Sequence, residues 1–537
     1  MAVTAQLEPA PPPDRPLVPP RSVRRAVDRW EILILVLFAG LSLWVLAYDL
    51  LQAAGPGRVW TGTDGIFPPD QLQYMAWVRD ASHHLLVSDM YVLRPTPHDY
   101  LEPLVALAGG LTALGLAPWA ALLVFQPLAV GAVFLAIRAY LHRSLSGRWE
   151  RRAALILAVF AGPFVILNAP VVAEWIPFWT WGYLPGVLAV AALVGALVAY
   201  DRAVRQGRAV WLAPILGLLA SWLHPWQGEE LLLILLAYEV GRHTRIGRRY
   251  LEPHGTVRRA PAALPWLTAV ATLLPLLYYL LLDRLDPIWN LAQAAAALHG
   301  SSAKALLPLA PFFVAAAPGL WGRPRSFLVA TSRIWLLAAL AVYGLCEAGV
   351  GSTPRHAFAG ITIPLAVLIV GGARRIELGR IPRYRPLTAG LVLAVTVLAG
   401  VAVIQGVPAR VRPAFIGSDS SHALSYLAHD PQPGGVLTTR SLGAVTPGVT
   451  GRRTYIGDNF WSLPDHQRRD EQVRRLFYDH PSPLQARNFV LGTGARFVLA
   501  PCQVTTDLQR DLAPALAAIN RFGCATLYTL RPGDQTG

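Results

Sequence analysis

Long apolar runs alternate with short polar loops from Trp30 to Val407. Runs of this kind are typical of helices that cross a bilayer, because about 20 apolar residues span its hydrocarbon core. One short run, Leu101–Leu116, fits a re-entrant or interfacial helix better, since counting it as a span would invert every later loop. The remaining runs predict about eleven spans: Trp30–Leu51, Pro118–Tyr140, Ala153–Leu167, Leu184–Tyr200, Ala209–Leu223, Leu231–Val240, Pro261–Leu282, Ala305–Leu320, Ile334–Ala348, Phe358–Gly371 and Pro386–Val407.

A polar segment, Thr61–Tyr100, follows the first apolar run and interrupts this pattern. Pro68-Pro69-Asp70 signals the start of a helix. Tyr74 and Trp77 then recur with other apolar residues at helical spacing, with polar residues between them. An amphipathic helix beside a membrane span is expected to lie in the interface plane rather than to cross the bilayer. We therefore expect carboxylates at the water–lipid boundary, within an outer loop covering residues 52–117.

The C-terminal residues 408–537 have a different pattern, in which short strand-like and longer helix-like runs alternate. Such alternation predicts a separate α/β domain with a mainly parallel sheet. Motifs for nucleotide binding are missing from this part of the sequence. The expected strands are Gly435–Thr439, Arg453–Ile456, Arg496–Ala500 and Ala525–Leu530, and the expected helices are Ser421–His429, Asp465–Tyr478, Pro483–Leu491 and Asp507–Asn520.

Composition and charge support this organisation. Of the 537 residues, 54% are hydrophobic and 15% are charged, against about 25% charged residues in a typical soluble domain. The net charge of +15 comes from one lysine and many arginines, which crowd the loops on one side of the predicted spans. This bias is a topology signal rather than a nucleic-acid footprint. It predicts a multi-pass protein of the cell membrane, with a disordered cytoplasmic tail over 1–29, a transmembrane region over 30–407 and an extracytoplasmic C-terminal domain.

The three cysteines show no metal-binding spacing. Cys346 lies in an apolar run, where it is expected to pack. Cys502 follows one predicted strand and Cys524 precedes another. If these strands are neighbours, the two sulfurs can form a disulfide in an oxidising compartment. His83-His84 is a weak metal signal, because no third ligand follows at a defined spacing. No cofactor is expected, and a divalent metal is not indicated.

Polar and aromatic residues gather in the loops assigned to the outer side. Aromatic side chains near carboxylates suit a sugar, and basic residues at the start of a span suit a phosphate. Several have a simpler interpretation: Asp70 as a helix cap, Asp89 as a solvated loop residue, and the polar groups at span ends as interface anchors. The candidate binding residues are Tyr74, Asp89, Glu174, His224, Gln227, Glu229, Lys304, Arg355 and His356.

Two segments and the overall arrangement carry a resemblance. The first outer loop contains PDQLQYMAWVRDA, and a late span is introduced by PRHAFAGITIPLAVLI before the C-terminal α/β region. This arrangement resembles the GT-C superfamily of membrane glycosyltransferases, which use polyprenyl-phosphate-linked sugars. The resemblance implies that Asp70 is the catalytic base and that Arg355 engages the lipid phosphate. Gln71 stands where many members have a second acidic residue.

The resemblance implies an enzyme that acts on the outer, extracytoplasmic side of the cell membrane. It would move a sugar from a polyprenyl-phosphate donor to a glycan, glycolipid or protein, and one displacement would invert the anomeric carbon. Two alternatives stay open. A transporter or lipid-sugar flippase should show ionisable residues within its spans and a repeated topology, and a non-catalytic scaffold would need no polar constellation on one face.

Overall fold

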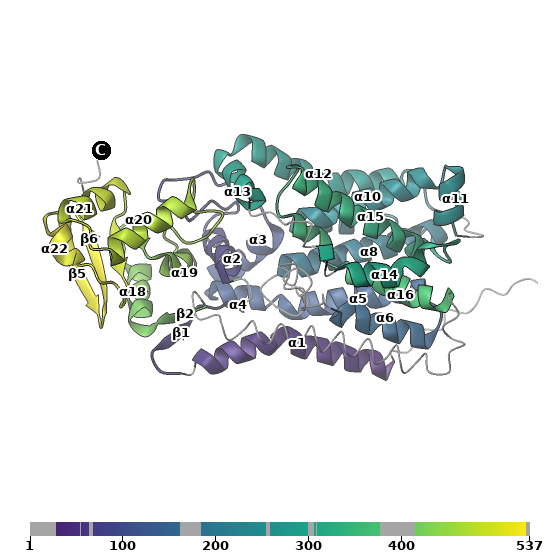
Figure 1. Cartoon of the computed structure of the whole chain (residues 1–537), viewed down its shortest axis with the longest axis horizontal. Coiled ribbons are helices and arrows are strands. Elements are labelled where there is room, and N and C mark those ends of the chain that lie inside the picture. Colours follow the sequence, from purple (N-terminus) through teal and green to yellow (C-terminus); the bar gives the residue numbers. More distant parts are fainter. Residues whose placement is uncertain are drawn as a thin grey trace, which may run out of the picture.

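Apolar runs of the sequence form helices that lie along the long axis of the molecule (Figure 1). The computed structural model describes residues 28–53, 55–63, 68–161, 184–253, 258–298, 306–307, 309–375 and 414–532. Six of its helical segments are long and apolar enough to cross a membrane, so the protein is a multi-pass membrane protein. They are α1 (Arg29–Ala53), α4 with α5 (Pro118–Leu123 and Gln126–Ser144), α8 (Leu184–Gln206), α12 (Leu264–Leu285), α15 (Phe327–Glu347), and η4 with α16 (Pro354–Phe358 and Thr362–Arg375).

Shorter helices fill the spaces between these segments and correspond to several of the expected spans. The expected span Pro386–Val407 and most of the tail over 1–29 lie outside the described residues. About eleven spans therefore stays a prediction. The shorter helices are α6 (Arg148–Phe160), α9 (Leu212–Leu223), α10 (Pro225–Gly241), α11 (Arg245–Leu251), α13 (Pro287–Leu298) and α14 (Ala310–Leu320).

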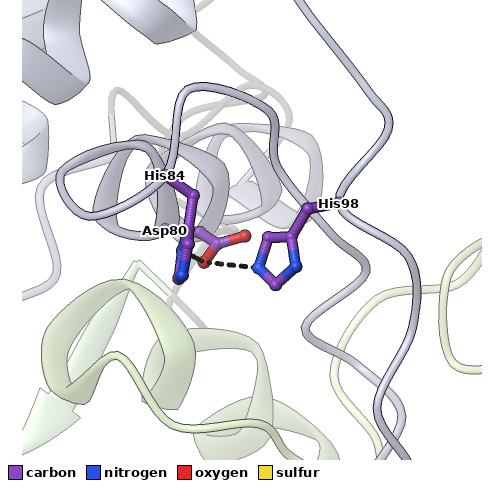
Figure 2. A group of neighbouring side chains, drawn as sticks. All are labelled: Asp80, His84 and His98. Carbon is purple, nitrogen blue, oxygen red and sulfur yellow. Dashed lines mark hydrogen bonds and ion pairs between the residues drawn. The ribbon is translucent and has the colours of Figure 1, made fainter.

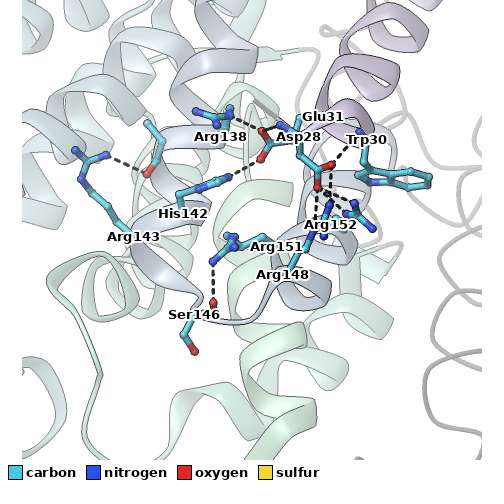
Figure 3. Close-up of polar contacts among 11 residues, drawn as sticks. Asp28, Trp30, Glu31, Arg138, His142, Arg143, Ser146, Arg148, Arg151 and Arg152 are labelled. Carbon is cyan, nitrogen blue, oxygen red and sulfur yellow. Dashed lines mark hydrogen bonds and ion pairs between the residues drawn. The ribbon is translucent and has the colours of Figure 1, made fainter. Parts of the chain in front are cut away.

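Ion pairs attach the start of α1 to its neighbours (Figure 3). Asp28 accepts hydrogen bonds from Arg148 and Arg152, the shortest being 2.7 Å from Arg152 Nη2. These bonds hold the pKa of Asp28 well below its usual range. Glu31 is buried one turn later and accepts from Arg138 Nε at 2.8 Å and from His142 Nε2 at 2.5 Å. The acids at this end of the helical bundle are thus matched by basic side chains of α5 and α6.

The opposite end of the bundle carries two short helices, α2 (Pro68–Ala81) and α3 (Pro103–Ala113). At 1.5 Å per residue, α3 is about 16 Å long. It packs on α2 so closely that a Cβ added at Gly109 would come within 2.4 Å of the Ala81 Cβ. That the apolar run 101–116 does not span the membrane stays a prediction.

The C-terminal residues 414–532 contain a four-stranded sheet in the order β3-β4-β6-β5. Only β3 and β4 are parallel, whereas β4–β6 and β5–β6 are antiparallel, so the prediction of a mainly parallel sheet is wrong. The elements are β2 (Phe415–Gly417), α18 (Ser418–His429), β3 (Val436–Thr438), α19 (Arg440–Thr450), α20 (His466–Tyr478), α21 (Pro483–Gly492), β4 (Phe497–Ala500), α22 (Leu508–Leu512), η6 (Ala513–Ala515), β5 (Leu516–Phe522) and β6 (Ala525–Leu530).

A tight turn explains the error in the predicted sheet. The run Asp507–Asn520 was expected to be one helix, but α22 ends at Leu512 and β5 begins at Leu516. Strands β5 and β6 then form a hairpin through Gly523, whose positive φ of 57° a glycine adopts without strain. The expected strand Arg453–Ile456 forms only an isolated bridge between Val436 and Thr454.

Two further links hold the C-terminal region. Cys502 and Cys524 form a disulfide with Cα atoms 4.7 Å apart, at the ends of the neighbouring strands β4 and β6. Strand β2 pairs antiparallel with β1 (Arg58–Trp60), which directly follows α1. The chain entering the first loop and the chain entering the C-terminal region therefore lie side by side at one end of the bundle (Figure 1).

Candidate functional site

Helix α2 carries the predicted base, and the helix forms where the sequence predicts it. It begins at Pro68, so Asp70 is the third helical residue rather than the cap. A carboxylate in the first turn still interacts favourably with the positive end of the helix dipole. Tyr74 lies one turn further and meets Trp77 edge-on, with ring centroids 5.5 Å apart. Burial, followed by the charges of Glu102 and Asp70, raises the pKa of Tyr74 well above its usual value.

An aromatic cluster joins α2 to three distant parts of the chain. The Trp77 ring lies 4.7 Å from the Tyr100 ring and 5.3 Å from the Trp461 ring, measured between centroids. Trp289 of α13 completes the cluster, 4.7 Å from Tyr100 and 5.1 Å from Trp461. Offset and edge-to-face pairs of this kind add stability beyond their buried area. The cluster places broad aromatic surface next to the helix that carries Asp70.

Asp89 is buried rather than solvated, with 6% of its surface exposed. Its Oδ1 accepts a hydrogen bond from Tyr91 N at 2.8 Å. Asp458, from the C-terminal region, is equally buried and accepts from the backbone N–H groups of Phe460 and Trp461. The second oxygen of each carboxylate has no hydrogen-bond partner among the described residues. Burial raises the pKa of Asp89 to about 7 and that of Asp458 to about 6, and each charge opposes the ionisation of Tyr91 between them.

Arg453 fixes the loop that carries Asp89. Its Nη1 donates to the backbone oxygen of Asp89 at 2.6 Å and to Thr96 Oγ1 at 2.9 Å. Its Nη2 donates to Ser88 Oγ at 2.9 Å. The backbone continues the contact, because Thr454 N donates to Met90 O at 3.0 Å. The C-terminal region is thus hydrogen-bonded to the first loop through the Arg453 guanidinium and the backbone of the next residue.

A second group of candidate residues forms where α10 begins. His224 precedes the helix and is hydrogen-bonded to Gln227, and its ring lies 4.8 Å from the His356 ring between centroids. Gln227 Nε2 donates to His356 O at 3.3 Å, and Trp226 Nε1 donates to Ser352 O at 2.9 Å. Three residues predicted from two separate loops, His224 and Gln227 from one and His356 from the other, therefore come together.

Helix α9 connects the two groups. Trp222, at its end, donates from Nε1 to Leu101 O at 3.0 Å, two residues before His224. Tyr278 and Tyr279 of α12 strengthen the same junction: the Tyr278 hydroxyl donates to Asp99 O at 2.6 Å, and the Tyr279 hydroxyl donates to Trp222 O at 2.6 Å. The chain between Asp80 and α3 is thereby tied to the start of α10.

The other candidates have varied outcomes. Arg355 lies half-buried in η4, beside His356. Glu229 lies in the first turns of α10. Glu174 and Lys304 fall outside the described residues. Whether Arg355 shares a cavity with Asp70 stays a prediction.

Sequence reasoning missed Arg453, Asp458 and Trp461. The run Gly457–Trp461 combines an acid, an amide and two aromatic residues, and this composition could have marked the segment as a candidate binding site. Its partners in the first loop, however, lie more than 350 positions earlier, and the hydrophobic periodicity of a sequence carries no information over that separation. His98 was also missed as a partner of His84: with Asp80 they present ligand atoms within 4.8 Å of one another, the described group on this face best suited to hold a metal ion.

No family model matches the chain, and no curated protein matches it. Solved structures do match. The oligosaccharyltransferase AglB from Archaeoglobus fulgidus, in complex with an inhibitory peptide and a dolichol-phosphate, aligns with a TM-score of 0.51 and 13% identity over 88% of this chain and 69% of its own. ArnT from Cupriavidus metallidurans, bound to undecaprenyl phosphate, aligns with a TM-score of 0.50 and 14% identity over 95% of this chain and 100% of its own.

A third match is the mycobacterial arabinofuranosyltransferase AftD, with a TM-score of 0.53 and 15% identity over 94% of this chain and 42% of its own. All three neighbours are GT-C glycosyltransferases. This chain has the GT-C fold. The resemblance noted in the sequence is confirmed at the level of the fold. The first loop, the starts of α10 and η4, and the C-terminal region meet at one end of the bundle.

Proposed function

We propose that this protein is a membrane glycosyltransferase that takes a sugar from a polyprenyl-phosphate donor and attaches it to an extracytoplasmic glycan, glycolipid or protein. The observation that supports it most is the placement of α2. Helix α2 carries Asp70 in its first turn and Trp77 of the aromatic cluster two turns later, and it packs against α19 of the C-terminal region. The neighbours AglB and ArnT, solved with dolichol-phosphate and undecaprenyl phosphate, support the class of donor.

Asp70 is the proposed general base. Its carboxylate would take the proton from the acceptor hydroxyl as that oxygen attacks the anomeric carbon of the donor sugar. The bond from that carbon to the phosphate oxygen breaks as the new bond forms, so the configuration inverts. The first-turn position suits this role, because the helix dipole favours the ionised carboxylate that a base requires. Tyr74, one turn away and adjacent to Trp77, would bound the sugar.

Arg355 is the proposed phosphate ligand. It lies in η4, seven residues before the start of α16, and the proposal is that a phosphate bound between them would also face the positive end of that helix. A guanidinium there would neutralise the phosphate as it leaves. His224, Gln227 and His356, which lie together beside it, supply further polar contacts on the same side. The orientation implied is a cytoplasmic N-terminus and an outer C-terminal region.

The first test replaces Asp70 by Asn. Transfer from radiolabelled polyprenyl-phosphate sugars to acceptors in membranes carrying the variant should fall by about 10²–10⁴-fold, the usual contribution of a general base. The melting temperature and donor binding should change little. Glu471→Gln, the same chemical change on exposed α20, is the matched control and should retain full transfer. Activity of Asp70→Asn within a few-fold of the unmodified protein would contradict the assignment and direct the search to Asp89, Glu174 and Glu229.

The second test concerns Arg355. Arg355→Ala should lower kcat/KM for the donor by about 30-fold, the equivalent of roughly 2 kcal/mol for one charge-assisted contact. Arg355→Lys should retain part of the activity, since it preserves the charge but not the planar fork. Arg284→Ala, at an exposed site near the end of α12, is the control. An effect of Arg355→Ala no larger than that of the control would remove Arg355 from the donor site and favour Lys304 or His224.

A further inference from the structure

Three side chains of the first loop converge beyond the C-terminal end of α2 (Figure 2). Asp80 lies in the last turn of the helix, His84 four residues later, and His98 on the returning part of the loop. Asp80 Oδ1 lies 3.0 Å from His84 Nδ1 and 3.5 Å from His98 Nε2. The two imidazole rings are tilted against each other, with centroids 4.1 Å apart. One carboxylate oxygen and two ring nitrogens thus face a common point.

The spacing of these atoms matches a metal site. Zinc binds His nitrogen and carboxylate oxygen at about 2.0–2.2 Å in tetrahedral geometry, which places neighbouring ligand atoms about 3.3 Å apart. The two separations measured from Asp80 Oδ1 bracket that value, and all three ligand atoms lie within 4.8 Å of one another. The sequence supplied only the pair His83-His84, and the fold supplies the missing third ligand from residue 98.

The second oxygen of the Asp80 carboxylate is hydrogen-bonded within the protein. Its Oδ2 accepts from Ser88 N at 2.8 Å and from Ser88 Oγ at 3.1 Å. Ser88 Oγ in turn accepts from Arg453 Nη2. Such outer hydrogen bonds orient metal ligands and tune their affinity. Asp80 is buried while His84 and His98 are partly exposed, so a fourth position faces solvent.

We propose that Asp80, His84 and His98 form a binding site for a divalent transition metal, with zinc the best fit. Two imidazoles and one carboxylate are the ligand types that zinc accepts, whereas calcium and magnesium prefer oxygen ligands throughout. The site is distinct from the proposed catalytic base, since ten helical residues separate Asp80 from Asp70, about 15 Å along the axis. The inference therefore goes beyond the proposed glycosyl transfer and does not depend on it.

The consequence of metal binding is structural. The bridge between Val87 and Tyr100 closes the loop that contains Asp89 and the Arg453 contacts. A metal held by α2 on one side and by His98 on the other would close this loop a second time. It would hold Asp89 beneath the C-terminal region and reduce opening of the loop.

One other described cluster has metal-ligand character but is excluded on chemical grounds. Asp419, Cys502 and Cys524 lie close together, but both sulfurs are used in the disulfide. Among the clusters of the described residues, the histidine site is therefore the one available for zinc in the oxidised protein, and substitutions of its histidines assign the bound zinc to it when the affinity tag contains no histidine.

The test measures zinc directly. The full chain, purified in detergent with a histidine-free tag, is stripped with a chelator, dialysed and titrated with Zn²⁺. Elemental analysis should find about one zinc per chain bound to the site, and zinc should raise the melting temperature. His84→Asn and His98→Asn should each weaken binding by at least about tenfold, and Ser88→Ala by about 10–100-fold, as expected for an outer-sphere partner. His83→Asn, which changes the exposed neighbour outside the cluster, should bind like the unmodified protein.

Cobalt provides a second measurement that does not depend on stability. Co²⁺ added to the stripped protein should give the visible absorption of a four-coordinate site, and His98→Asn should abolish it. The proposal is overturned if the unmodified protein binds no more zinc than the His84→Asn/His98→Asn double variant. It is equally overturned if His83→Asn loses as much zinc as His98→Asn. Transfer activity plays no part in either comparison, so the two proposals fail or survive separately.

Discussion

Acids near the two ends of the helical bundle differ in their hydrogen-bond partners. At the start of α1, Glu31 and Asp28 each receive hydrogen bonds from two basic side chains (Figure 3). At the other end, Asp89 and Asp458 are as deeply buried as Glu31, but each has only backbone N–H donors and one oxygen without a partner among the described residues. Arg453 bonds to the backbone oxygen of Asp89 rather than to its carboxylate.

The presence or absence of basic partners distinguishes acids that stabilise the fold from acids that are available for function. A buried carboxylate with its own basic partners stays ionised and anchors two helices. A buried carboxylate without one is costly when charged, and proteins keep such groups mainly at functional sites. The end where Asp89 and Asp458 lack such partners is also the end that carries Asp70, the aromatic cluster and the histidine site, in which Asp80 does have imidazole partners. Three substitutions can break or sharpen the comparison.

The largest effect on stability is expected from Arg453→Gln. The change removes the guanidinium that holds Ser88, Asp89 and Thr96, and it leaves several buried acceptors without a donor. The loss should be about 3–5 kcal/mol, above the value for one charged hydrogen bond. The melting temperature in detergent measures it, with Arg468→Gln on exposed α20 as the control. Equal melting temperatures for both variants would show that the C-terminal region does not depend on this contact.

A smaller effect of opposite sign is expected from Asp89→Asn. Because burial raises the folded pKa to about 7, above the unfolded value near 3.9, the folded state binds more protons between those pH values. Stability should therefore fall as pH rises from about 4 to about 7 and stay low above it. Asp89→Asn should remove most of this fall and stabilise the protein at pH 8 by roughly 2–4 kcal/mol.

The measurement is a series of melting temperatures from pH 5 to pH 8 for both proteins. Asp458, with its pKa raised to about 6, should leave a weaker dependence of the same sign in the variant. If the melting temperature of Asp89→Asn fell more steeply with pH than that of the unmodified protein, Asp89 would not be the buried acid that destabilises the fold at high pH.

The smallest effect is expected from Glu31→Gln, the counterpart at the paired end. The substitution removes the acceptor of Arg138 and His142, whose side chains are partly exposed and regain some hydration. Destabilisation should be about 1–2 kcal/mol, in the range for a partly buried ion pair. The sign is the decisive readout, because Asp89→Asn should stabilise at pH 8 while Glu31→Gln destabilises. A shared sign would show that the two ends do not differ as described.

Local patterns allowed much of this fold to be predicted. The apolar runs predict the long helices, and Pro68-Pro69-Asp70 followed by helical spacing predicts α2 to within its first turn. The strand ends at Cys502 and Cys524 predict the disulfide. The prediction of the sheet topology was wrong because the residues after Leu512 have apolar character that is compatible with either a helix or a strand. Pairing with β6, a non-local contact, decides in favour of the strand.

The candidate site was predictable only in parts. His224, Gln227 and His356 belong to polar clusters at span ends, which is a signal that a sequence provides. Asp89 looked like a solvated loop residue because nothing near it in sequence buries it. Arg453, which bonds to its backbone oxygen, and Asp458, whose charge adds to the rise of its pKa, come from a region with its own periodicity. Burial produced by distant segments cannot be deduced from hydrophobic pattern alone.

The pairing of β1 with β2 also sets the order of events during synthesis. Thr61 bonds to Ala414 across a sequence separation of 353, so most of the chain must be synthesised before the first loop can contact its partner. At 5–20 residues per second, that delay is roughly 20–70 s. During this time α2 presents Trp77 and Met75 without Trp461 and Gly448 to cover them. A nascent chain truncated before residue 414 would therefore display an uncovered apolar face, which chaperones and proteases can recognise, and the site would be completed only when synthesis is nearly finished.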